Sequence, residues 1–158
     1  MKNPPTLKET VSAIAPVLLT MLEQYPGLSP ALQKYYRDAI YWMIRKLPIC
    51  AGKASPSAIQ EAERLGIPSL AGFWWEHQVA YDKNREILHW EHVVPVGDVR
   101  DTLISLAHPS IEKVASILMT YEIAWITKLE DKRLKRSKRA DPHEEYRRAG
   151  IELVDLKR

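Results

Sequence analysis

The chain is poor in cysteine: Cys50 is the only one among 158 residues. A single thiol excludes an intramolecular disulfide framework and a zinc site built from several cysteines. Such a composition is typical of proteins that work in a reducing compartment. We therefore expect a cytoplasmic protein.

Long apolar runs are also missing. The apolar piece from Ala13 to Leu22 is short and is interrupted by Pro16. The first residues, Met-Lys-Asn-Pro-Pro-Thr, do not begin a signal peptide. No stretch approaches the roughly 20 apolar residues that a membrane-spanning helix needs, so we expect no membrane partner.

The net charge is small. Lys and Arg number 23 against 20 Asp and Glu, which leaves +3 and does not by itself indicate a nucleic-acid partner. The basic residues nevertheless concentrate in one late segment, residues 128–139. This segment is expected either to contact the phosphates of DNA, with RNA not excluded, or to form the solvated face of a helix. Its basic members are Lys128, Lys132, Arg133, Lys135, Arg136, Lys138 and Arg139.

The first half of the chain carries helical patterns. Apolar residues recur at helical spacing over residues 6–24, where Pro16 predicts a kink or a break. A broader apolar face covers residues 30–47 and follows Ser29-Pro30, an N-cap with proline at the first helical position. These two segments are the clearest helices that the sequence predicts.

Residues 55–81 predict two helices joined by a short turn at Gly66. The first begins at Ser55-Pro56 and the second at Ser69. Helix-turn-helix DNA recognition is therefore one interpretation. The second helix, however, begins with the apolar residues 70–75 where base-reading side chains should be polar, which favours plain packing.

The second half mixes short strands with short helices. Residues 85–90 and 121–126 read as strands, and the second is apolar enough to be covered on both faces. The other expected elements are helices over 99–107, 110–119 and 142–149, a basic helix after Thr127, and an edge strand over 151–154.

The stretch Leu88-His89-Trp90-Glu91-His92-Val93-Val94-Pro95 carries the strongest indication of chemistry. It places a carboxylate and an imidazole side by side at the end of a strand. Adjacent side chains on a regular strand point to opposite faces, so Glu91 and His92 converge only if the chain bends near Pro95. A histidine can take a proton from water at neutral pH, and a carboxylate can hold a divalent ion at a phosphodiester.

The string Glu91-His92-Val93-Val94-Pro95 resembles the Asp-His-Ile-Val-Pro string of HNH endonucleases, the His-Me finger or ββα-metal group. Residues 125–133 look like the second strand and the helix of that family, so the resemblance spans residues 85–136. It implies that His92 is the general base, that Glu91 binds the metal, and that Asp131 or Glu130 supplies the helix ligand. The implied cofactor is Mg²⁺, or else Mn²⁺. The family's helix histidine or asparagine and its middle asparagine have no clear counterpart here.

The chain length, the helical patterns and the resemblance together predict a fold. We expect a mainly α protein with a small β element (α+β), in a single domain of residues 1–158. Its helical part, residues 1–82, would pack on a ββα-metal-like part, residues 83–158, that contains inserted helices and a basic C-terminal helix.

Three functions stay open. The first is a metal-dependent nuclease acting on DNA, and the second is a non-enzymatic helical DNA-binding or adaptor protein. The third is a protein-interaction module, such as a phage or defence-system accessory factor. His89 shares the strand face of Glu91 and would be an extra ligand or a phosphate contact, although a role outside function is the simpler interpretation.

Overall fold

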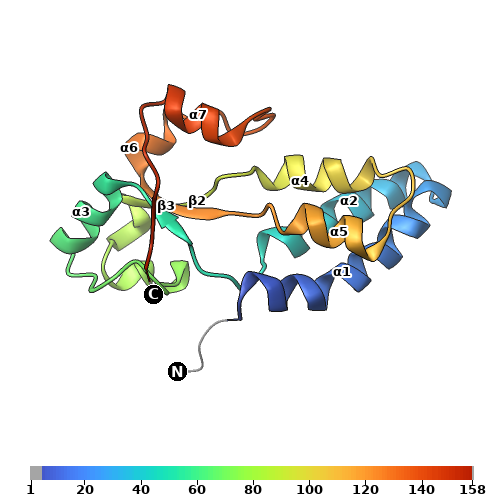
Figure 1. The fold of residues 1–158 in the computed structure, drawn as a ribbon, viewed down its shortest axis with the longest axis horizontal. Helices are drawn as coiled ribbons and strands as arrows, with labels where there is room; N and C mark the ends of the chain where they lie inside the picture. The colour runs from blue at the N-terminus through green and yellow to red at the C-terminus, as the bar shows by residue number, and fades with distance from the viewer. Residues whose placement is uncertain (1–4, 158) are drawn as a thin grey trace. The chain divides into compact units, whose positions relative to one another are not determined.

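The computed structural model describes residues 5–157 and confirms a mainly α fold with a small mixed sheet (Figure 1). The chain divides into two compact units. Unit 1 comprises residues 1–49 and 95–121, and unit 2 comprises residues 50–94 and 122–158. The chain therefore leaves unit 1, returns to it and leaves again, whereas the sequence suggested one internal boundary after residue 82.

Unit 1 is made of helices. It contains α1 (Leu7–Gln24), the 3-10 turn η1 (Tyr25–Gly27), α2 (Pro30–Arg45), α4 (Val96–Ile104) and α5 (Ile111–Leu118). In this unit α1 contacts α5, α5 contacts α4, and α4 contacts α2. Each of these four helices contributes fully buried apolar side chains, among them Leu18, Ile40, Ile44, Leu103 and Leu118.

Pro16 lies within α1 but does not break it. A proline removes one helical hydrogen bond, and two features offset that loss. The helix begins at a capping box in which the backbone N–H of Thr6 donates to the Glu9 carboxylate at 2.8 Å. Its inner face is buried through Val11 and Leu18. Of the two outcomes expected at Pro16, a kink or a break, the break is therefore wrong.

Unit 2 contains the whole sheet. Its strands are β1 (Lys53–Ala54), β2 (Leu88–His92), β3 (Ile123–Thr127) and β4 (Val154–Asp155), in the order β2-β3-β1-β4. β2 and β4 run antiparallel to their neighbours, and β1 runs parallel to β3. The helical elements of unit 2 are α3 (Pro56–Arg64), η2 (Trp75–Ala80), η3 (Lys83–Arg85), α6 (Lys128–Asp131) and α7 (Pro142–Arg148).

Two expected helices of unit 2 are absent or shortened. Residues 69–81 form turns and the 3-10 element η2, with Gly72 at φ +76°. Without a second α-helix in this segment, the helix-turn-helix interpretation is wrong. The basic helix after Thr127 ends at Asp131. A longer helix would place like charges four residues apart, as at Lys128 and Lys132, which is unfavourable.

The two faces of the β2–β3 pair differ in character. Glu91 lies opposite Ala124, and Trp90 lies opposite Trp125. On the Trp90 face, the rings of Trp90 and Trp125 pack edge to face with centroids 4.8 Å apart. On the Glu91 face, Ala124 belongs to an apolar cluster completed by Val93, Ile126, Leu134, Tyr146 and Ile151. Glu91 is thus a carboxylate at the margin of a core.

Within residues 5–157, no helix combines the length and apolar character needed to cross a bilayer. Residues 1–4, where the sequence argues against a signal peptide, lie outside this range.

Candidate metal centre

Three side chains with metal-binding atoms meet beside β2: His89, Glu91 and Asp131. One ligand atom from each lies within 4.8 Å of the others. His89 Nε2 is 3.0 Å from Glu91 Oε2 and 3.5 Å from Asp131 Oδ1. One imidazole and two carboxylates at this spacing form a donor set suited to a divalent cation.

The strand register and a helix cap bring these side chains together. His89 and Glu91 are two residues apart on β2 and therefore share one face. The neighbouring strand β3 leads directly into α6, whose first backbone N–H, that of Lys128, donates to the Ile87 carbonyl at 2.8 Å. This bond fixes the start of α6 beside His89, and the single turn of α6 then places the Asp131 carboxylate next to His89 Nε2.

Lys128 occupies the other side of the His89 ring. Its ammonium Nζ lies 2.8 Å from His89 Nδ1. Because an ammonium can only donate, Nδ1 accepts, and the proton of a neutral imidazole then lies on Nε2, facing the carboxylates. Both ring nitrogens are engaged. For a cation to bind at Nε2, the neutral ring must carry its proton on Nδ1 instead, and Lys128 Nζ can then no longer donate to that nitrogen.

Glu91 is held by a buried arginine. The Arg139 side chain is 2% exposed, and its Nη2 donates to Glu91 Oε1 at 2.7 Å. Burial alone would raise the pKa of Glu91, but hydrogen bonds from His89 and Arg139 outweigh burial and lower this pKa below its ordinary value. Glu91 is therefore ionised at neutral pH and available as a ligand.

His92 does not join this cluster. It is the last residue of β2, and the strand pleat directs it to the face of Trp90, opposite Glu91. The bend that would have turned both residues to one site is absent, because Val93 still donates to the Glu122 carbonyl at 3.0 Å and continues the ladder. The expected convergence of Glu91 and His92 is not formed, and His89 occupies the position next to Glu91.

Glu130 is used by the fold. Its side chain is buried and accepts hydrogen bonds from the Thr127 backbone N–H at 2.8 Å and from Ser55 Oγ at 2.7 Å. With Thr127 it forms the capping box of α6. Of the two acids that the sequence left open as the helix ligand, Asp131 lies in the cluster and Glu130 does not.

The seven basic residues of segment 128–139 fall into three groups. Lys128 lies at the cluster, and Arg139 is buried against Glu91, so its guanidinium is not available to phosphates. The rest form an exposed basic segment on turns rather than on a helix: Lys132, Arg133, Lys135, Arg136 and Lys138.

The sequence alone predicts part of this cluster. The two-residue spacing of His89 and Glu91 predicts a shared strand face, but a lone histidine gave no reason to prefer His89 over His92. The pairing of Arg139 with Glu91 could not be predicted from the sequence, since the two residues lie 48 positions apart in the chain.

Comparison with family models, with curated proteins and with solved structures finds no match to this chain. Its function is therefore argued from the geometry of the cluster.

Proposed function

We propose that the chain is a metal-dependent nuclease that hydrolyses phosphodiester bonds of DNA, with its divalent ion held by His89, Glu91 and Asp131. The observation that carries this proposal is the meeting of their three ligand atoms within 4.8 Å. The ligand set differs from the one that the HNH resemblance implies, because His89 joins Glu91 and Asp131 while Glu130 is used by the fold. His92, which the resemblance makes the general base, lies on the opposite face of β2.

The surroundings of the cluster suit a phosphodiester. A bound Mg²⁺ or Mn²⁺ would supply a Lewis acid for the phosphoryl oxygen and an activated water. Lys128 Nζ, 2.8 Å from His89 Nδ1 on the other side of the ring, adds a positive charge close to the cluster. The exposed basic segment begins immediately after Asp131 in the chain and includes Lys132, Lys135 and Arg136, whose exposed positions suit contact with the flanking phosphates.

Plasmid nicking with added Mg²⁺ or Mn²⁺ tests the proposal. We expect the native protein to nick DNA and EDTA to stop it. Asp131→Asn is the informative variant, because asparagine keeps the shape of the side chain and removes the negative charge that would hold the cation. Asp155→Asn is the matched control: it makes the same chemical change on β4, at the opposite edge of the sheet from β2.

Abolished cleavage in Asp131→Asn together with normal cleavage in Asp155→Asn supports the nuclease. Equal cleavage by both variants, or cleavage that survives EDTA, contradicts it. If folded, metal-loaded protein binds DNA with a steep dependence on salt but does not cut it, the exposed basic segment makes a DNA-binding protein the better account.

A further inference from the structure

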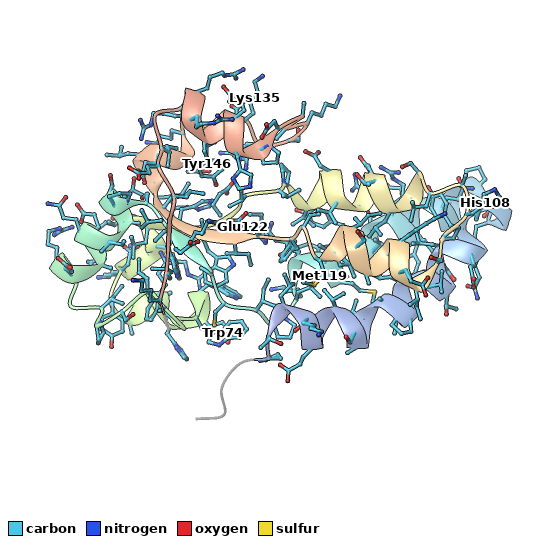
Figure 2. All side chains as sticks on the ribbon, viewed as in Figure 1. Trp74, His108, Met119, Glu122, Lys135 and Tyr146 are labelled. Carbon is cyan, nitrogen blue, oxygen red and sulfur yellow. The ribbon has the colours of Figure 1, made fainter. Side chains whose placement is uncertain are left out.

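Arg139 is tied to its surroundings at every nitrogen. Its Nε donates to the Lys135 carbonyl, and its Nη1 donates to the carbonyls of His92 at 3.1 Å and Val93 at 3.0 Å. The guanidinium also lies over the ring of Tyr146, 5.8 Å from its centroid. Figure 2 labels Tyr146 on α7, the helix that follows this segment. A group fixed in this way cannot shift to suit a ligand.

The two carboxylate oxygens of Glu91 have different partners. Oε1 accepts from Arg139 Nη2 at 2.7 Å, and Oε2 faces His89 Nε2 at 3.0 Å. Since Arg139 occupies Oε1, only Oε2 is directed at the point where His89 and Asp131 meet.

We propose that Arg139 is a positioning residue that restricts Glu91 to coordination through a single oxygen, and that the site therefore selects a six-coordinate ion such as Mn²⁺ over Ca²⁺. This inference rests on the metal centre of the proposed function. Arg139 touches no substrate and acts through Glu91.

Coordination chemistry gives the reason for this selectivity. Ca²⁺ takes six to eight oxygen ligands and often binds a carboxylate through both oxygens, whereas Mg²⁺ requires near-octahedral six-coordination. The imidazole of His89 adds a nitrogen donor, whereas Ca²⁺ and Mg²⁺ are hard ions that prefer oxygen ligands. Mn²⁺ is a first-row transition ion that binds carboxylate oxygens and also accepts nitrogen ligands. A carboxylate with one oxygen already engaged removes a bidentate contact that Ca²⁺ would otherwise make.

The test is Mn²⁺ binding followed by electron paramagnetic resonance, with Ca²⁺ as competitor. Native protein should bind Mn²⁺ clearly more tightly than Ca²⁺. Arg139→Lys keeps the positive charge but loses the planar fork that grips Oε1. We expect it to weaken Mn²⁺ binding about tenfold, as loss of a ligand-orienting partner does, and to narrow the preference for Mn²⁺ over Ca²⁺.

Arg148→Lys is the matched control, because Arg148 pairs with Glu145 on α7 of the same unit at 2.9 Å. A purely structural role for Arg139 would lower the unfolding midpoint without changing the ratio of the two dissociation constants. An unchanged ratio in folded Arg139→Lys overturns the proposal. If that variant does not fold, native protein that prefers Ca²⁺ or does not discriminate overturns it.

The two proposals fail in different ways. Mn²⁺-loaded native protein that leaves DNA intact while Arg139→Lys changes the ion preference contradicts the nuclease and keeps the role of Arg139. DNA cleavage by native protein, together with an ion preference that Arg139→Lys leaves unchanged, supports the nuclease and contradicts the role of Arg139.

Discussion

At the scale of single residues, the pair Glu91–Arg139 links the candidate site to the fold. Both side chains are largely buried, at 12% and 2% exposure, and their atoms meet at 2.7 Å. An ion pair in such surroundings is costly to break from one side, because the remaining charge stays desolvated without its partner. The same carboxylate is therefore a candidate ligand as well as a structural element.

The first prediction is that Glu91→Gln destabilises unit 2. Removing the charge leaves the Arg139 guanidinium buried without its counter-ion, which should lower the free energy of unfolding by about 3 kcal/mol. Urea unfolding followed by tryptophan fluorescence measures the change. Glu152→Gln, at an exposed position, is the control. Equal unfolding midpoints for the two variants would show that the pair contributes little.

At the scale of elements, the short helix α6 places Asp131. The helix has four residues and depends on its capping box, in which Thr127 Oγ1 accepts from the Glu130 backbone N–H at 3.2 Å. Ser55 Oγ donates to the same Glu130 carboxylate and ties the cap to the start of α3. A four-residue helix cannot persist without such contacts.

The second prediction concerns this cap. Thr127→Val keeps the shape and β-branching of the side chain but removes the hydroxyl, and should cost about 1 kcal/mol of stability. Because Asp131 then loses its fixed position, Mn²⁺ affinity should fall as well. The control is Thr120→Val, whose hydroxyl lies on an exposed turn. Unchanged Mn²⁺ affinity in Thr127→Val would mean that α6 is positioned by other contacts.

The third prediction concerns the exposed basic segment. Lys132→Ala with Lys135→Ala should weaken DNA binding and reduce the slope of log affinity against log salt by about 0.9 for each phosphate that the protein no longer neutralises. Fluorescence anisotropy of a labelled duplex at several salt concentrations measures both quantities. Lys8→Ala with Lys34→Ala removes the same charge from exposed positions on α1 and α2. Equal slopes in the two double variants would contradict phosphate binding by this segment.

Elements with strong local signals were predictable from the sequence. Ser55-Pro56 and Ser110 begin α3 and α5 as expected, and each serine accepts the capping hydrogen bond that the pattern predicts. The strand pair β2–β3 was also expected, within a few residues. The two-residue strand β1 was missed, because so short a segment has no periodicity and its pairing with β3 is distant in sequence.

The candidate site was predictable only in part. Glu91 and Asp131 were both named from the sequence, but the choice of histidine depended on whether the chain bends after Glu91. The sequence does not determine such a bend, since it depends on whether Val93 continues its pairing beyond β2. Arg139 looked like one cation in a basic run, and only tertiary packing distinguishes it from its exposed neighbours.

At the scale of the whole molecule, the chain path separates a helical unit from the unit that holds the candidate site. Residues 95–121 leave unit 2 between β2 and β3 and complete the helical unit 1. The two strands of the candidate site are thus neighbours in the sheet although two helices intervene in the sequence. The candidate metal centre, Arg139 and the exposed basic segment all lie in unit 2.

The central claim is that His89, Glu91 and Asp131 together bind a divalent cation. The most direct measurement is paramagnetic broadening of backbone amide NMR signals by substoichiometric Mn²⁺, in native protein and in Asp131→Asn. We predict that in native protein the broadening centres on residues 88–92 and 127–132 and that it disappears in the variant. Broadening centred elsewhere, for example around Glu122 and His143, or broadening unchanged in Asp131→Asn, would contradict the account.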